Sequence, residues 1–292
     1  MATARQTVDA ATQYRDVELL KAGRMKPLEN DMDNVVGKWA LVTGASSGFG
    51  VEFATLLAEQ KANLVLAARR TEPMERLAEQ LRRRHPVSVV VEGIDLSMPG
   101  AAAELKARLD RRGIVVDVLV NNAGLGLYGS FVDQPLQKIV DMLQLNMITL
   151  TELTYTFGKD MVERRSGHIL LLASLLGYQA TPGYAAYAAS KAYVLTFGEA
   201  LHAELKSSDV GVTVLSPGPT STSFGDVAGQ RDTPVIRMLM MKPLPVARIG
   251  LRAMFDHKMS VVAGLLNKLI VFTFRFAPRR VQGQVMQKAI SG

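Results

Sequence analysis

The 292-residue sequence contains no cysteine and only four histidines. The first absence excludes disulfides, thiolate zinc sites and cysteine nucleophiles, and it leaves no residue from which to infer a redox compartment. The histidines are scattered along the chain, and no cluster of metal-ligating residues accompanies them. We therefore expect no metal, and we interpret the histidines as structural or solvated.

Long apolar runs are also absent. No stretch approaches the ~20 apolar residues that a membrane-spanning helix needs, and the N-terminus lacks the continuous apolar segment of a secretory signal. We therefore expect a cytoplasmic protein. The longest late apolar stretch, from Leu269 to Phe276, is interrupted by Arg275. It is too short to span a bilayer, although it could lie on a membrane surface.

The composition is that of a globular protein, with 48% hydrophobic and 21% charged residues. The net charge of +7 is compatible with nucleic acid, an anionic membrane, a polyanionic cofactor or only a solvated surface. The arginines occur in scattered pairs, and no basic stripe is interleaved with aromatic residues. We therefore expect no nucleic-acid partner.

Apolar runs alternate with helical segments from Lys38 onward. Several runs are continuously apolar, which favours strands buried on both faces of a parallel sheet. The order predicts a single-domain, doubly wound α/β sheet, the Rossmann fold. We expect an N-terminal extension over 1–36, a catalytic domain over 37–263 and an apolar, basic tail helix over 264–292. The expected strands are 39–44, 63–69, 87–95, 116–124, 167–174 and 210–218. The expected helices are 49–60, 73–84, 101–112, 134–164, as one long helix or a bent pair, and 184–207.

A glycine-rich turn follows the first expected strand and opens the first helix. It reads TGASSGFG and holds Gly44, Gly48 and Gly50. Gly44 allows a tight turn, Gly48 lets backbone approach a pyrophosphate, and Gly50 lets the helix pack near the sheet, where free N–H groups would meet the phosphates. The alternative is a strand–helix turn with no ligand. The candidate dinucleotide-binding residues here are Gly44, Ser46, Ser47, Gly48, Phe49 and Gly50.

The second strand ends in Arg69 and Arg70, where an NAD site usually carries an acid. Arginines there could pair with a 2′-phosphate, so we favour NADP(H) over NAD(H). The alternative is two solvated arginines at a helix entrance.

The third strand ends in Asp95 and Leu96; the acid could bind the adenine amino group or cap a helix. The fourth ends in Asn122, Ala123 and Gly124, which could leave room for a ring or be structural.

Ser174, Tyr187 and Lys191 form the decisive group. Tyr187 and Lys191 are four residues apart on an expected helix and share one face. Tyrosine is a poor base at its ordinary pKa of about 10, and a neighbouring ammonium would lower that pKa. Ser174 ends the fifth strand and could donate to a substrate oxygen. An isolated YxxxK pattern would more often be a surface pair.

Together these motifs resemble the short-chain dehydrogenase/reductase family over about residues 36 to 262, and most resemble its tailed bacterial NADP-dependent reductases. The resemblance adds Pro217, Gly218, Thr220 and Thr222 as a loop around the nicotinamide amide, and Asn146 as a fourth catalytic residue. It implies that Tyr187 is the general acid/base, that Ser174 polarises the substrate oxygen and that Asn146 positions a water leading to Lys191. Tyr187 and Lys191 would also bind the cofactor, with Lys191 holding its ribose.

The expected substrate is a hydrophobic ketone, aldehyde or secondary alcohol, because the loops after strands four to six are apolar and lack a fixed charge. The family implies a homo-oligomer, a dimer or tetramer, with the helices of Asn146 and Tyr187 at its interfaces. The tail leaves three alternatives open: packing on the body or a sister subunit, a substrate lid, or membrane-surface contact. The expected lining is Leu125, Leu127, Tyr128, Leu175, Leu176, Tyr178, Phe224 and Met238 to Met241.

Three rival functions remain open. The first is a sensor or scaffold that binds NADP(H) without turnover, although such a protein need not keep Ser174, Tyr187 and Lys191 together. The second is an epimerase or dehydratase, for which little chain remains to build a second substrate domain. The third is a membrane-surface lipid reductase anchored by its tail.

Overall fold

The computed structural model describes residues 35–222, 224–230 and 233–291. The expected extension over 1–36 therefore lies outside the described residues, apart from its last two. From Val35 onward the chain forms one compact unit. The tail belongs to this unit and does not form a separate one.

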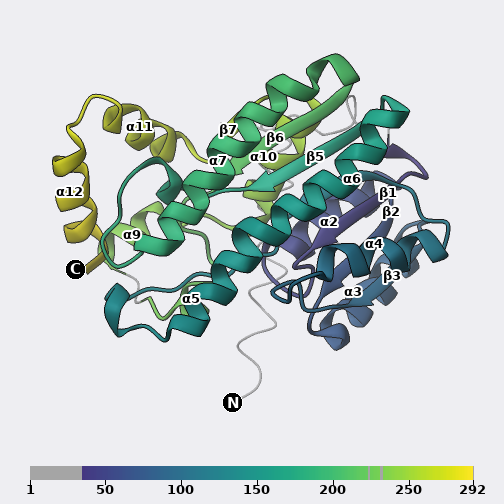
Figure 1. The fold of residues 1–292 in the computed structure, drawn as a ribbon, viewed down its shortest axis with the longest axis horizontal. Coiled ribbons are helices and arrows are strands. Elements are labelled where there is room, and N and C mark those ends of the chain that lie inside the picture. The colour runs from purple at the N-terminus through teal and green to yellow at the C-terminus, as the bar shows by residue number, and fades with distance from the viewer. Residues whose placement is uncertain (1–34, 223, 231–232, 292) are drawn as a thin grey trace. The chain divides into compact units, whose positions relative to one another are not determined.

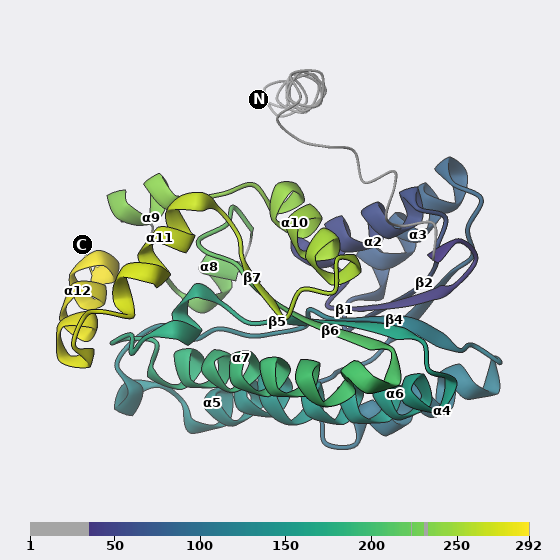
Figure 2. The same ribbon diagram turned by 90° about the horizontal axis from the view of Figure 1, so that it is seen from above.

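The described residues form a seven-stranded parallel sheet in the order β3-β2-β1-β4-β5-β6-β7. Helices cover both of its faces (Figures 1 and 2), which confirms the doubly wound fold. The strands are β1 Trp39–Thr43, β2 Asn63–Ala68, β3 Val89–Gly93, β4 Val116–Asn121, β5 Gly167–Leu172, β6 Val210–Ser216 and β7 Ser260–Val262. The last strand was not expected, because three residues are too few to show a pattern.

The helices divide between the two faces of the sheet, as Figure 2 shows. On one face lie α2 Phe49–Glu59, α3 Thr71–Arg84 and α10 Pro243–Phe255, and on the other lie α4 Ala101–Arg111, α5 Leu136–Leu143, α6 Leu150–Arg164 and α7 Ala185–Leu205. Two short helices, α8 Phe224–Ala228 and α9 Pro234–Leu239, follow β6. The continuously apolar strands are buried by this double cover, as β6 shows with all seven residues buried.

The helix expected over 134–164 is a bent pair. A π-helical segment, Gln144–Thr149, joins α5 to α6. It contains Asn146, which is fully buried. A π turn adds one residue to the helical repeat and frequently occurs at functional sites. Here it brings an asparagine into the interior between two amphipathic helices.

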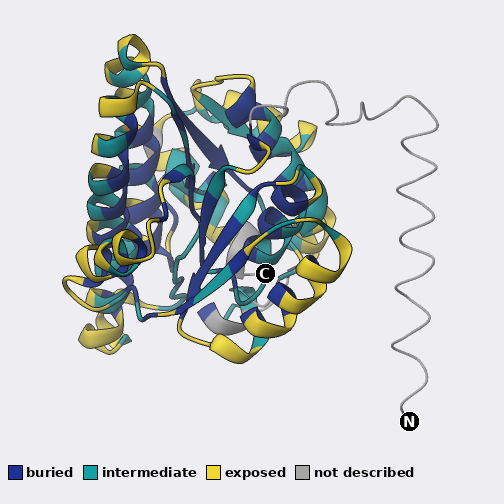
Figure 3. Ribbon diagram, turned by 90° about the vertical axis from the view of Figure 1, so that its right-hand side faces the viewer, coloured by how far each residue is buried: buried dark blue, intermediate teal, exposed yellow. Residues whose placement is uncertain are grey.

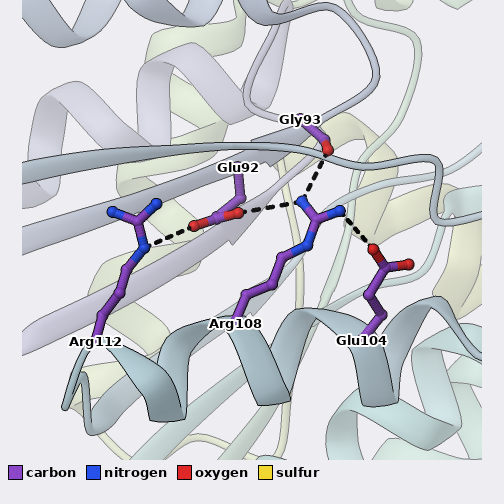
Figure 4. A network of polar contacts seen from close by, with 5 residues as sticks. All are labelled: Glu92, Gly93, Glu104, Arg108 and Arg112. Atoms are coloured by element: carbon purple, nitrogen blue, oxygen red, sulfur yellow. Dashed lines mark hydrogen bonds and ion pairs between the residues drawn. The ribbon is translucent and has the colours of Figure 1, made fainter.

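A buried carboxylate joins β3 to α4. Glu92 is 4% exposed, and its two oxygens lie 3.3 Å from Arg108 Nη1 and 3.3 Å from Arg112 Nε. Arg108 also donates to the Gly93 carbonyl at 3.0 Å and pairs with Glu104 (Figure 4). A buried carboxylate needs such partners, so this network fixes the edge strand on its helix.

A partly buried histidine on β5 makes stability depend on pH. Burial, together with the smaller effects of His257 and Lys38, lowers the pKa of His168 to about 4. The unfolded chain therefore binds a proton first, so this contribution is complete above pH 6.5 and is lost as the pH falls toward 4.

The expected result is that the wild type loses about 1–2 kcal/mol more stability between pH 7 and pH 5 than His168→Gln does. Urea unfolding at both pH values measures it, with His85→Gln, at the partly exposed end of α3, as the control. Equal losses in the wild type and His168→Gln would contradict this assignment.

The tail consists of two helices and not one. They are α11 Leu265–Phe274 and α12 Arg279–Ser291, and Pro278 stands between them. Proline cannot continue the preceding helix without losing a hydrogen bond, which explains the break. No helix among the described residues combines the length and apolarity needed to cross a bilayer.

Candidate active site

The carboxyl ends of β1, β4 and β5 meet at one edge of the sheet, and the glycine-rich turn leaves β1 there. Gly44 and Gly48 have φ angles of +67° and +57°, a region that favours glycine. A Cβ on Gly50 would lie 2.3 Å from the Gly44 carbonyl oxygen, and one on Gly48 would lie 3.4 Å from Thr222 Cγ2. Helix α2 therefore starts directly against the strand end, with the loop of Thr222 facing the turn.

The end of β4 is tied to β1 by side chains. Asn122 Nδ2 donates to the Thr43 carbonyl at 2.7 Å. Thr43 Oγ1 accepts from the backbone N–H groups of Asn122, at 3.0 Å, and Ala123, at 2.9 Å. These bonds give Asn122 the structural role that the sequence left open, and they hold Ala123 and Gly124 beside the glycine turn.

Two arginines border the glycine turn. Arg70 Nη2 donates to Ser46 Oγ at 3.4 Å, and Arg69 Nη1 lies 3.9 Å from Asp95 Oδ2. Asp95 Oδ1 also accepts from the N–H and hydroxyl of Ser97, at 3.0 and 2.7 Å. Partial burial raises the pKa of Asp95, but the bonds from Ser97 and the charge of Arg69 leave it below its usual range. Asp95 therefore caps the following turn, whereas Leu96 packs in the main core.

The catalytic candidates lie together at the ends of β5 and α7. Tyr187 and Lys191 are 6% and 5% exposed, and Lys191 Nζ lies 5.9 Å from the centre of the Tyr187 ring. Lys191 donates to the Leu172 carbonyl at 2.7 Å. Ser174 Oγ accepts from the Leu176 N–H at 3.2 Å and shares a hydrogen bond with the Tyr187 hydroxyl.

Burial has the largest effect on the pKa of both titratable groups. It raises the pKa of Tyr187 to about 12, although the Ser174 hydrogen bond lowers it, and it lowers the pKa of Lys191 to about 8. The sequence predicts that Lys191 lowers the tyrosine pKa; in this structure burial raises that pKa instead. Tyr187 therefore keeps its proton near neutral pH and is suited to donate it.

Asn146 connects three parts of the site. Its Oδ1 accepts from the Leu125 N–H at 2.9 Å, and its Nδ2 donates to the Leu125 carbonyl at 2.9 Å and to Ser190 Oγ at 3.1 Å. A Cβ on Gly124 would lie 3.2 Å from Asn146 Oδ1 and 3.5 Å from Lys191 Nζ. The side-chain amide thus holds the backbone after β4 beside Lys191; its water-positioning role stays a prediction.

An aromatic series lies beside Tyr187. Ring centres are 5.1 Å apart for Tyr128 and Tyr184, 5.5 Å for Tyr184 and Tyr187, and 5.5 Å for Tyr187 and Phe224. Leu125, Leu127 and Leu176 pack against the same cluster. The apolar environment expected from the loops is therefore present around the phenol.

Three residues expected to line this region lie elsewhere. Tyr178 packs against the main core, and Met238 is 69% exposed. Met241 pairs through its backbone with the 219–221 loop, and its sulfur lies 3.8 Å from Asn267 Nδ2. A sequence pattern places these loops at the site but does not determine which way each side chain points.

Other residues join the cluster without any sequence signal. Met142, Tyr184 and Ala228 are buried in it, and Met286 of α12 packs against it. Gln179 is 7% exposed and donates to Met286 Sδ at 3.7 Å, while its Oε1 has no hydrogen-bond partner among the described residues. Only the folding back of the tail brings Met286 to this place.

The loop after β6 is held from both sides. The Pro217 carbonyl accepts from the Leu175 N–H at 2.8 Å, and the Gly218 carbonyl accepts from Thr220 Oγ1 at 3.0 Å. A Cβ on Gly218 would lie 2.3 Å from Nδ2 of Asn267 in α11. The tail therefore packs directly on the loop that the sequence assigns to the nicotinamide.

Comparisons with known proteins agree with this architecture. A family model described as "short chain dehydrogenase" matches residues 38–232. Dehydrogenase/reductase SDR family member 7B of Rattus norvegicus is 35% identical over 191 residues, which are 63% of this chain and only 58% of that protein.

Two solved structures extend the likeness over more of the chain. A structure of a 7beta-hydroxysteroid dehydrogenase has a TM-score of 0.79 at 25% identity and covers 87% of this chain and 98% of that one. A short-chain dehydrogenase from Sphingobium yanoikuyae in complex with NADPH has a TM-score of 0.74 at 29% identity, with 82% and 93% covered. The family-model match over residues 38–232 includes the glycine turn and the Ser174–Lys191 region.

Proposed function

The chain belongs to the short-chain dehydrogenase/reductase family, and from this membership we propose that it is an NADP(H)-dependent oxidoreductase. It interconverts a hydrophobic ketone or aldehyde and the corresponding alcohol, with Tyr187 as the general acid/base. The observation that carries the proposal is the buried pair of Tyr187 and Lys191, with Ser174 at the phenol, beside an aromatic cluster.

The residues present fit a dinucleotide. Gly48 lacks a side chain where the turn approaches Thr222, which leaves backbone free to face a phosphate at the start of α2. Arg70 reaches Ser46 at the rim of this turn, and Arg69 lies beside it in sequence. These cations support a 2′-phosphate. The family uses NAD or NADP, and the relative from Sphingobium yanoikuyae was solved with NADPH.

The side chains have complementary roles in carbonyl reduction. The nicotinamide supplies the hydride when it is bound. Ser174 and Tyr187 hydrogen-bond the carbonyl oxygen, and the Tyr187 O–H bond breaks as its proton moves to that oxygen, forming the alcohol. Lys191, with its ammonium held at the Leu172 carbonyl, stabilises the phenolate left behind. In oxidation the proton moves in the opposite direction.

The substrate is bulky and apolar. Tyr128, Tyr184 and Phe224 surround the acid/base with rings, and Leu125, Leu127 and Leu176 pack in the same cluster. One protein of similar structure is named for hydroxysteroids, which supports a ketone of that size. Gln179 adds one buried polar group beside this apolar surface.

A panel of ketones and aldehydes tests the activity through oxidation of NADPH, followed by absorbance. We expect turnover of bulky apolar ketones and little turnover of small charged ones. Turnover confined to small charged substrates would contradict the substrate class. Tight binding of NADPH without turnover of any compound would favour the sensor function instead.

The arginine at the turn should set the cofactor preference. In Arg70→Gln, loss of a charge-assisted contact should raise the KM for NADPH about 10- to 100-fold and leave the KM for NADH nearly unchanged. Steady-state kinetics with both cofactors measures this. Arg76→Gln, an exposed arginine of α3 paired with Glu72, is the matched control. Parallel losses for NADPH and NADH would exclude a 2′-phosphate contact.

A further inference from the structure

Helix α11 exposes a stripe of large apolar side chains. Leu265, Leu269 and Phe272 are 85%, 56% and 56% exposed, and Phe276, just beyond the helix, is 75% exposed. They follow one another at intervals of four, three and four residues, which places them on one side of a helix. The rings of Phe272 and Phe276 meet edge to face at 5.3 Å. We call these four residues the tail stripe.

The opposite side of the same helix is covered, and it carries Asn267 and the partly buried Ile270, Val271 and Phe274. Asn267 is 2% exposed and donates to the Ala263 carbonyl at 2.8 Å, and its amide lies against Gly218. Helices of globular proteins ordinarily bury their apolar stripe and expose their polar one. In α11 the side that faces solvent is apolar as well, so the tail stripe stays exposed and does not pack on the core of the chain.

Positive charge accompanies the stripe. Lys268 and Arg275 are exposed on α11 and at its end, seven residues apart. After Asp256 the sequence contains six lysines and arginines and no acid. Helices that lie in the interface of anionic bilayers typically carry exposed leucine and phenylalanine next to lysine and arginine.

We propose that the tail stripe docks on the surface of an anionic phospholipid bilayer. The apolar side chains enter the boundary between headgroups and acyl chains, and Lys268 and Arg275 pair with lipid phosphates. A second copy of this chain is disfavoured as the occupant, because it would bring two acid-free tails together. Figures 1 and 2 show α11 and α12 at one end of the sheet, and Figure 3 shows the strands buried between helices whose outward sides are exposed.

Docking there places the membrane next to the proposed active site. Asn267 of α11 lies against Gly218, and Met286 of α12 packs on the cluster that contains Tyr187, so the tail that carries the docking surface also contacts the proposed site. Provided that the proposed activity holds, an apolar ketone dissolved in the bilayer has a short path to the site. The binding itself does not depend on that activity.

Co-sedimentation of the full chain with vesicles tests the proposal. We expect binding to vesicles that contain phosphatidylglycerol, weakening with salt, and much less binding to pure phosphatidylcholine. Leu269→Ser/Phe272→Ser should lower the apparent partition coefficient at least tenfold. Lys268→Gln and Arg275→Gln should each lower it about fivefold, as expected for one cation near an anionic surface.

Matched controls separate the stripe from exposed residues in general. Val132→Ser, at an 84% exposed apolar position on another loop, and Arg83→Gln, on α3, should bind as the wild type does. Unaltered turnover of a water-soluble ketone by the Leu269/Phe272 variant would show that it is folded and would separate this proposal from the proposed function. Absence of vesicle binding, equal binding by the stripe variant, or self-association that only the stripe variant abolishes would each overturn the proposal.

Discussion

Tyr187→Phe should lower kcat for carbonyl reduction by about 10²- to 10⁴-fold, the range that a positioned proton donor contributes. The substitution removes one oxygen and keeps the ring that packs on Tyr184 and Phe224, so the site keeps its shape. NADPH affinity should stay within about threefold, because the phenol donates to the carbonyl oxygen and contributes little to holding the phosphates. Steady-state kinetics and a separate NADPH titration measure the two effects.

Tyr184→Phe is the matched control, because this neighbouring phenol is also buried and bonds Gln230. It should keep kcat within about tenfold. The pH profile adds a second check. With a pKa of about 12, Tyr187 stays protonated between pH 6 and 9, so loss of its proton should not lower the rate of reduction in that range. Retention of most activity in Tyr187→Phe would remove Tyr187 from the mechanism.

Asn146→Leu should have the largest effect on stability, about 3 kcal/mol or more, together with at least a tenfold loss of kcat/KM. The new side chain has a similar size but leaves the N–H and carbonyl of Leu125 without their partners, and each buried unpaired group costs about 1–3 kcal/mol. Displacement of Gly124 then shifts Lys191. Urea unfolding and steady-state kinetics measure the two losses.

Asn63→Leu offers a matched comparison on β2. Asn63 also bonds one backbone carbonyl and one N–H, of Gly37 and Ser88, each at 2.8 Å, but at an exposed place. Water can replace those bonds, so the cost should stay near 1 kcal/mol. Equal destabilisation by both variants would show that burial of Asn146 is not what makes it important. A stable Asn146→Leu with unaltered kinetics would exclude its positioning role.

The two charged motifs illustrate what sequence reasoning can and cannot reach. The place of Arg70 after a strand predicts a phosphate contact, and the structure puts its side chain at Ser46. The sequence allows Asp95 to contact adenine or to cap a helix, and only the bonds from Ser97 favour the cap. Spacing along the chain locates a residue at the sheet edge, whereas the partner of a side chain depends on neighbours distant in sequence.

The sequence by itself determined the parallel sheet, the order of its motifs and the pairing of Tyr187 with Lys191, because these follow from local periodicity: apolar runs form strands, and residues four apart share a helix face. The tertiary structure alone decided which residues distant in sequence contact each other and which side chains are buried. It placed Asn146 on Leu125, raised the pKa of Tyr187 by burial and turned Asn267 inward while the tail stripe faced outward. Burial and long-range contacts depend on how distant segments pack, and no local pattern encodes that packing.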